Sequence, residues 1–141
     1  MLYVIDDEAL ESRRNIISLG CLRHVEIYKY LVKSHYGLLA YNRIFFHEYT
    51  NLIRAYMFSH VGVIPVITST FKNMINDLRD YAIVVPADDF ASHLIRTLNS
   101  LIKDFNYEEF LYKREKLIDY AHKNLVGEKQ EPQILDVVKM V

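Results

Sequence analysis

The residues best suited to chemistry lie in a loop, residues 42–51, and at the start of the helix that follows it. Glu48 carries a carboxylate, and Arg54 adds a positive charge just inside the helix. Thr50 or Asn51 can cap this helix by accepting hydrogen bonds from its first N–H groups. Such N–H groups also bind anions. We therefore expect a ligand site in this loop. The alternative for Asn51 is that it only caps the helix, and the alternative for Glu48 and Arg54 is that they are solvent-exposed charges without a ligand.

Two short apolar runs, Tyr36–Tyr41 and Val63–Thr68, flank this segment and predict strands. Between them an apolar stripe at helical spacing predicts a helix that lies on a sheet; its members are Leu52, Ala55, Tyr56 and Ser59. A strand, a crossover helix and a second buried strand form a parallel βαβ unit. Ligands of such sheets bind beyond the carboxyl ends of the strands, which is where we expect this loop.

The whole chain alternates between strand and helix patterns, which predicts one α/β domain over residues 1–141 with a mostly parallel sheet. The five expected strands are Leu2–Ile5, Ile16–Leu19, Tyr36–Tyr41, Val63–Thr68 and Ala82–Val85. Besides the crossover helix, helices are expected over His24–Ser34, Phe71–Arg79, a long segment capped by Asp88 or Asp89, Tyr107–Asn124 and a terminal segment within 129–141.

The composition excludes several classes of protein. The net charge is −1 and no run of Lys and Arg occurs, so we expect no nucleic-acid partner. Cys21 is the only cysteine, which excludes an internal disulfide, and we expect it to be a small buried residue. No apolar run of about 18 residues and no signal peptide are present, so we expect a cytoplasmic protein without a transmembrane segment.

A metal site is not expected, because the histidines show no ligand spacing; they are His24, His35, His47, His60, His93 and His122. His47 is the one that lies in the expected site loop. The sequence also contains no G-x-S-x-G, Walker or G-x-G-x-x-G motif. The catalytic residues of any enzyme activity are therefore not identified by motif.

Four segments resemble the C-terminal, nucleotide-sugar-binding domain of retaining glycosyltransferases of the GT-B kind. They read NIISLGCLRHVEIYKYLVKSHYGLLAY, NLIRAYMFSHVGVIPVITS, AIVVPADDFASHLIRTLNSLIKD and HKNLVGEKQEPQILDVV, and together they extend over nearly the whole chain. The resemblance implies a three-layer Rossmann-like fold with helices on both faces of a five-stranded sheet. It also implies transfer of a glycosyl group from a nucleotide-sugar donor to a hydroxyl acceptor.

The resemblance assigns roles to individual residues. Gly20 to Arg23 fall on the loop that contacts the nucleobase. The backbone N–H groups of Thr50, Asn51 and Leu52 would bind the donor phosphates, with Glu48 or Arg54 nearby. The implied ligand is a nucleotide-diphosphate sugar as donor substrate, with no cofactor and no metal.

The chain also departs from the family. The glutamate that binds the donor ribose is replaced by Ala55, and the first strand and the acceptor-binding N-terminal domain have no counterpart. We therefore expect Leu2–Ile5 to pair directly with Tyr36–Tyr41, or else a partner, either an acceptor-binding domain or a second chain, to cover the open sheet. The alternative to an active glycosyltransferase is an inactive remnant that serves as a nucleotide-binding or protein-interaction module.

Overall fold

The structure, a computed structural model, describes residues 2–4, 16–39 and 52–126 of the chain. The chain divides into two compact units, Met1–Ser34 and His35–Val141, and each is described by itself. The expected terminal helix within 129–141 lies outside the described residues.

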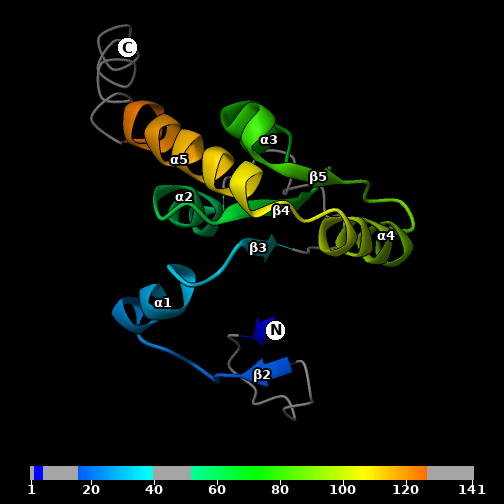
Figure 1. Cartoon of the computed structure of the whole chain (residues 1–141), viewed down its shortest axis with the longest axis horizontal. Coiled ribbons are helices and arrows are strands. Elements are labelled where there is room, and N and C mark those ends of the chain that lie inside the picture. The colour runs from blue at the N-terminus through cyan, green and yellow to red at the C-terminus, as the bar shows by residue number, and fades with distance from the viewer. Residues whose placement is uncertain (1, 5–15, 40–51, 127–141) are drawn as a thin grey trace, which may run out of the picture. The chain divides into compact units, whose positions relative to one another are not determined.

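The first unit contains a pair of parallel strands and one helix (Figure 1). Strand β1 (Leu2–Val4) pairs with β2 (Ile16–Ser18), with Leu2 opposite Ile16. Helix α1 (His24–Leu31) follows β2 after a short loop. The positions of these three elements agree with the prediction.

The second unit is built on a parallel sheet in which β4 lies between β3 and β5. Tyr36 of β3 is opposite Ile64 of β4, and Val66 of β4 is opposite Ile83 of β5. The elements are β3 (Tyr36–Leu39), α2 (Ile53–His60), β4 (Ile64–Thr68), α3 (Lys72–Leu78), a short 3-10 turn η2 (Arg79–Tyr81), β5 (Ile83–Val85), α4 (Phe90–Lys103) and α5 (Tyr107–Asn124). The predicted parallel βαβ unit is therefore confirmed as β3–α2–β4.

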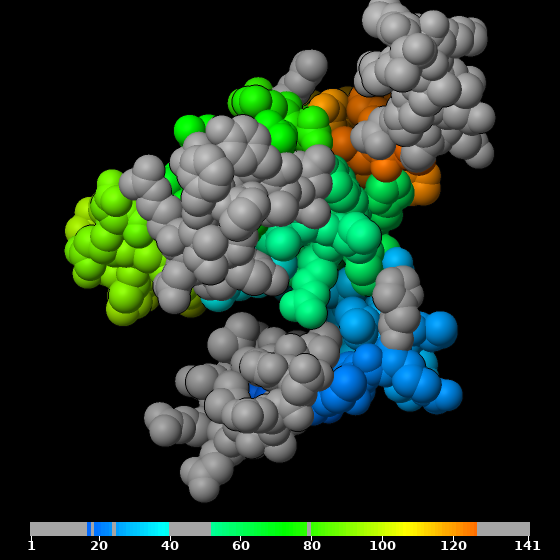
Figure 2. All heavy atoms as spheres, turned by 180° about the vertical axis from the view of Figure 1, so that it is seen from behind, coloured from blue at the N-terminus to red at the C-terminus, as the bar shows by residue number. Residues whose placement is uncertain are grey.

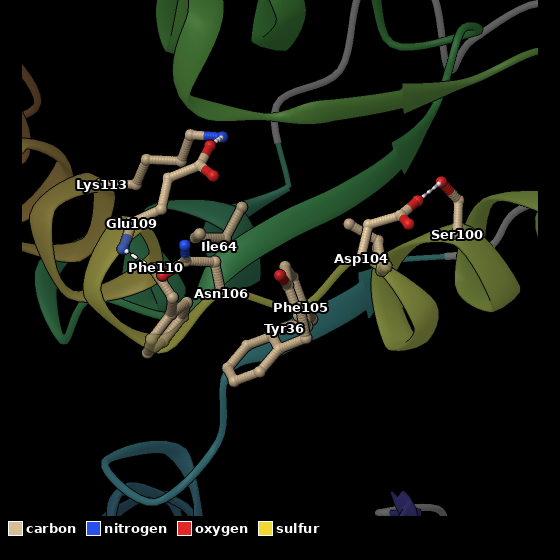
Figure 3. Close-up of a pocket in the computed structure, with 10 residues that line it drawn as sticks. Tyr36, Ile64, Ser100, Asp104, Phe105, Asn106, Glu109, Phe110 and Lys113 are labelled. Carbon is tan, nitrogen blue, oxygen red and sulfur yellow. Dashed lines mark hydrogen bonds and ion pairs between the residues drawn. The ribbon is translucent and has the colours of Figure 1, made fainter.

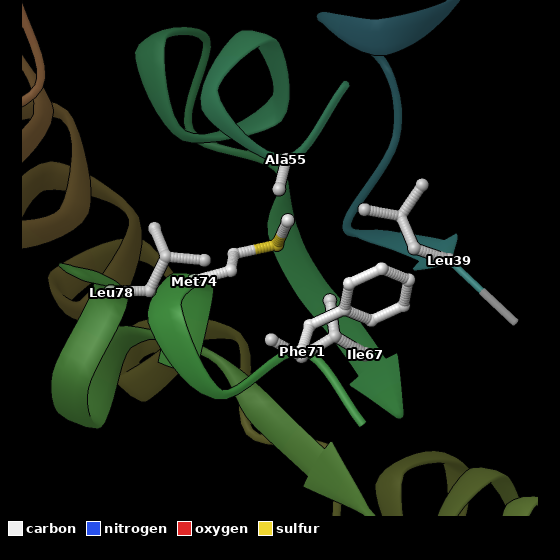
Figure 4. Packing of buried hydrophobic residues seen from close by; sticks show 6 residues of the cluster. All are labelled: Leu39, Ala55, Ile67, Phe71, Met74 and Leu78. Atoms are coloured by element: carbon white, nitrogen blue, oxygen red, sulfur yellow. The ribbon is translucent and has the colours of Figure 1, made fainter. Parts of the chain in front are cut away.

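Helices α2 and α3 cover one face of this sheet. Leu39 and Ile67 point from β3 and β4 toward Ala55 of α2 and toward Met74 and Leu78 of α3 (Figure 4). Each of these five side chains is almost fully removed from water. This apolar burial is the main favourable contribution to the stability of the unit, because burial contributes about 25 cal/mol for each Å² of apolar surface.

A second apolar cluster lies on the opposite face. It joins Ile64 of β4 to Phe110 and Leu117 of α5, with Tyr36 and Ile83 packed against it. Ile64 and Ile67 differ by an odd number of positions, so their side chains leave opposite faces of the strand. Helix α5 therefore packs against the second face where the three strands begin.

Helix α5 also reaches the ends of α2 and α3. Arg114 donates from Nη2 to the carbonyl oxygen of Val61, just after α2, at 3.2 Å. Tyr120 donates from its hydroxyl to the carbonyl oxygen of Asp77, near the end of α3, at 2.5 Å. The ends of α2 and α3 lie where the parallel strands begin. Helix α5 therefore lies across the amino edge of the sheet and not at its carboxyl edge.

The sheet itself differs from the expectation. Among the described residues the strands form two sheets, β1–β2 and β3–β4–β5, so the single five-stranded sheet is not confirmed. The expected ladder between Leu2–Ile5 and Tyr36–Tyr41 is likewise not among the pairings of the described strands. The coarser prediction, an α/β chain with parallel strands, is confirmed.

One prediction about burial is wrong. Cys21, expected to be buried, is exposed, because it lies in the open turn between β2 and α1. The spacing of apolar residues that predicts the long helix also places Ile95 and Ile102 on one side of it. In α4 this side is only partly covered, since Ile95 is 61% and Ile102 is 77% exposed. Figure 2 shows α4 (yellow-green) at the surface of the molecule.

Candidate functional site

The start of α2 lies at the carboxyl edge of the sheet. The residue at the cap position is Leu52, which packs against the cluster that contains Leu39, the last residue of β3, and Phe71, just after β4. The predicted capping residues, Thr50 and Asn51, lie outside the described residues. The apolar contact of Leu52 fixes the first turn one to two residues later than the polar side chains suggest.

Among the residues that the structure describes, no side chain caps α2, and its first turn contains no acidic residue. Leu52 accepts the hydrogen bond of Ala55 N–H at 2.9 Å, which begins the helix and leaves the earlier N–H groups outside the helical ladder. Arg54 is exposed beside them, and within the described residues it has no hydrogen bond or ion pair. The partial positive charge of the helix start, about half an elementary charge, is thus reinforced by a guanidinium.

The segment that leaves β4 at the same edge has its hydroxyl groups engaged. Thr68 Oγ1 lies 3.0 Å from Thr70 Oγ1, and both threonines are buried. Ser69 N–H donates to the carbonyl oxygen of Val85, and Ser69 Oγ accepts from the N–H of Ala87. These bonds tie the exits of β4 and β5 together and form a rigid support beside the helix start.

The position that the resemblance assigns to the ribose glutamate is in the core. Ala55 is 0% exposed and packs among Leu39, Ile67 and Met74. A carboxylate at this position would have no water and no partner, and burying an unpaired charge is costly. The residue match between Ala55 and the family glutamate therefore supplies no contact to a ligand.

The two expected site residues of the first unit lie around the start of α1. Gly20 has a φ of +62°, a left-handed conformation that glycine adopts without strain. The Arg23 guanidinium forms a 3.3 Å ion pair with Glu26, and the Glu26 carboxylate also accepts from the Arg23 N–H at 3.1 Å. These hydrogen bonds to Arg23 lower the pKa of Glu26. The charge of Arg23 is therefore already neutralised locally.

Sequence reasoning missed Glu26. The signal was available, because a glutamate three residues after the cap position commonly reaches back to the cap N–H group. Arg23 at the cap position hid it, since the usual capping residues are Ser, Thr, Asp and Asn. Arg23 therefore serves the local structure of α1, and its contact with a nucleobase stays a prediction.

The expected site is thus only partly described. Leu52 and Arg54 are neighbours at the start of α2, whereas Gly20 and Arg23 belong to the other unit. Glu48, Thr50 and Asn51 lie outside the described residues.

A small pocket lies at the opposite end of the sheet (Figure 3). Its volume is about 130 Å³, and Tyr36 and Ile64 line it from the first residues of β3 and β4. Burial raises the pKa of the Tyr36 phenol, an effect that nearby Lys113 opposes. Lys113 itself is paired with Glu109 at 2.7 Å. Ligand pockets usually measure about 300–1,000 Å³, so this pocket is too small for a nucleotide.

Comparison with protein-family models, with curated proteins and with solved structures found no match to this chain. In residues 2–4, 16–39 and 52–126 no group of three or more His, Cys, Asp or Glu side chains is arranged to hold a metal ion. None of the helices in these ranges is long and apolar enough to cross a membrane. The resemblance to glycosyltransferases therefore stays an expectation from the sequence.

Proposed function

We propose that the chain is a glycosyltransferase-like domain that binds the diphosphate of a nucleotide-sugar donor at the start of α2. The observation that carries this proposal is the first turn of α2 at the carboxyl edge of parallel strands, where no described side chain caps the helix and Arg54 is exposed. This edge is where open α/β sheets bind their ligands. Helix N-terminus and guanidinium together supply the two features that recognise a phosphate without a metal ion.

In this proposal the backbone N–H groups near Leu52 donate to the phosphate oxygens, and Arg54 pairs with the same anion. The sugar and the acceptor hydroxyl lie beyond the diphosphate. Transfer forms a bond between the sugar carbon and the acceptor oxygen and breaks the bond from that carbon to the donor phosphate. The nucleoside diphosphate leaves, and the proton of the acceptor hydroxyl passes to the departing phosphate oxygen. Glu48, Thr50 and Asn51 keep their assigned places around the donor as sequence-based expectations.

A second candidate function is a non-catalytic module that binds a nucleotide or a protein. The burial of Ala55 favours it, because the ribose contact typical of active relatives has no counterpart at that position. Both candidate functions use the same binding site at the carboxyl edge of the sheet. They differ in whether the bound donor reacts.

The first experiment is a thermal-shift screen of nucleotides and nucleotide sugars at millimolar concentration. A ligand that binds the folded state raises the melting temperature by mass action. We expect a shift with at least one nucleoside diphosphate or its sugar. The proposal fails if none of these ligands moves the melting temperature.

Arg54→Gln tests the site within the molecule. Loss of a charge-assisted contact to phosphate, which contributes about 1.5–3 kcal/mol, should weaken binding by roughly 10- to 100-fold. Arg96→Gln is the matched control, since Arg96 is exposed on α4. Equal binding by both variants contradicts the placement at α2.

A measured transfer or hydrolysis of the bound donor supports the enzyme, and binding without turnover supports the module.

A further inference from the structure

Two histidines from distant parts of the chain meet between α2 and α5. His60 is the last residue of α2, and His122 lies in the last turn of α5. Their ring centres are 5.3 Å apart, and the ring planes are inclined by 55°. Figure 1 shows α2 and α5 side by side. No part of the proposed donor site involves this pair.

The hydrogen bond of His60 fixes which of its nitrogens is free. His60 Nδ1 lies 2.8 Å from the carbonyl oxygen of Tyr56. A carbonyl oxygen only accepts, so Nδ1 must carry the hydrogen in this bond. In the neutral ring Nε2 then holds a lone pair, which is the arrangement found in metal-binding histidines whose other nitrogen donates to a backbone carbonyl.

His122 is free to adjust to a shared ligand. Its side chain is exposed, and within the described residues it has no hydrogen bond. Rotation about its side-chain bonds can therefore present either ring nitrogen. The Asp119 carboxylate, three residues earlier on α5, adds negative charge nearby, although Lys123 lies 3.9 Å from it.

The separation of the rings matches two ligands of one metal ion. A bond of about 2.0–2.1 Å from metal to nitrogen, plus about 1.1 Å to the ring centre, places each centre about 3.2 Å from the metal. At a tetrahedral angle the two centres are then about 5.2 Å apart. The observed separation of the ring centres, 5.3 Å, is close to this value.

We propose that His60 and His122 form a two-histidine site for a late first-row divalent cation, with Zn²⁺ as the representative ion. Imidazole nitrogen suits Zn²⁺, Cu²⁺ and Ni²⁺, and water completes the coordination. The bound cation links the end of α2 to the last turn of α5. It therefore stabilises the contact between these helices in proportion to its occupancy.

The test is calorimetric titration of the full chain with Zn²⁺ alone. We expect Zn²⁺ to bind the wild type, and the affinity to decrease by at least about tenfold in His122→Gln and in His60→Gln. Mutation of a residue that only hydrogen-bonds to a metal ligand already lowers metal affinity by about this factor. His93→Gln is the control, since His93 lies on α4 and should leave the affinity unchanged. His122 is exposed, so its variant should fold, which circular dichroism checks.

A spectroscopic measurement distinguishes direct ligands from a general effect on the fold. Zn²⁺ should move the ring nitrogen resonances of both His60 and His122 and leave those of His93 in place. The proposal is overturned if His122→Gln binds Zn²⁺ within about twofold of the wild type, or if millimolar Zn²⁺ leaves the rings of His60 and His122 unshifted.

Discussion

The hydroxyl of Tyr56 donates a 2.6 Å hydrogen bond to Oδ2 of Asp77. This bond joins the middle of α2 to the end of α3, and the carbonyl oxygen of Asp77 accepts from Tyr120 of α5. Tyr120 in turn stacks on Tyr81 with ring centres 4.8 Å apart. Three helices are thus connected by polar contacts at the amino edge of the sheet, away from the proposed donor site.

Replacing Tyr56 by Phe should lower the free energy of unfolding by about 1 kcal/mol. The loss is smaller than for a fully buried bond to a carboxylate, because the site is only half-buried and water can replace the phenol. Urea unfolding measures it. The control is Tyr107→Phe, since Tyr107 is 59% exposed and should change stability little. Equal losses in the two variants would contradict a role for the bond to Asp77.

Alkaline pH should weaken the same contact. Burial, followed by the hydrogen bond to Asp77 and its negative charge, raises the pKa of Tyr56. An unfolded tyrosine ionises near pH 10, so above that pH the unfolded chain loses its proton first. The stability contributed by Tyr56 is therefore complete below about pH 10 and is lost as pH rises toward the folded-state value. Unfolding curves at several alkaline pH values should show a smaller decline for Tyr56→Phe than for the wild type.

Gly62 should tolerate no side chain. Its φ is +73°, and a Cβ added there would lie 2.5 Å from Cγ of Arg114 and 2.8 Å from Cδ1 of Ile118. Gly62→Ala therefore combines left-handed backbone strain with a clash against α5, and we expect a loss of about 2–4 kcal/mol. Denaturant midpoints measure this loss.

Gly20→Ala is the matched control for that prediction. Gly20 has a φ of +62°, but a Cβ there would meet no atom within 4 Å. Only the backbone strain remains, so the loss should be about 1–2 kcal/mol. A loss at Gly62 no larger than that at Gly20 would show that α5 does not pack closely on the turn after α2.

The positions of helices and strands were largely predictable because their signals are local. The apolar run Val63–Thr68 predicted a buried strand, and all of β4 (Ile64–Thr68) is buried. The stripe that included Ala55 and Ser59 predicted the face of α2 that meets the sheet, and both residues are fully buried. The predicted helix Tyr107–Asn124 is α5, whose cap Asn106 accepts from two N–H groups of the first turn.

The pairing of strands was harder, because it depends on contacts between residues that are far apart in the sequence. The apolar pattern shows where the strands are, but not which strands pair with each other. The single five-stranded sheet was therefore an assumption taken from the resemblance. The exposure of α4 could not be predicted for the same reason. The spacing shows that Ile95 and Ile102 share a side of the helix, but it does not show whether another element covers that side. The contact between His60 and His122 could likewise not be predicted, because the two residues are far apart in the sequence and do not show the short spacing of metal ligands.

The site was predicted least well where two readings of one residue conflict. The apolar stripe places Ala55 toward the sheet, and the resemblance places the same position toward the donor ribose. In the structure the first reading is correct. A helix residue that packs on the sheet cannot also reach a ligand beyond the strand ends.

Ala55→Glu tests this conflict directly. If Ala55 is a core residue, the new carboxylate is buried without a partner and overfills the space beside Met74, so stability should fall by at least about 3 kcal/mol. Chemical denaturation measures the loss. Ile53→Glu is the matched control, because it introduces the same side chain two residues earlier at a position that is 73% exposed. There we expect a change within about 0.5 kcal/mol.

The same variant also tests the match to the glycosyltransferase family. A glutamate that reaches the donor ribose would leave the fold intact and tighten the binding of nucleotide sugars relative to the wild type. The burial of Ala55 predicts the opposite, a destabilised chain with no gain in affinity at temperatures where it stays folded. Tighter binding by a stable Ala55→Glu variant would therefore move this position from the core to the site and restore the active-enzyme reading over the non-catalytic module.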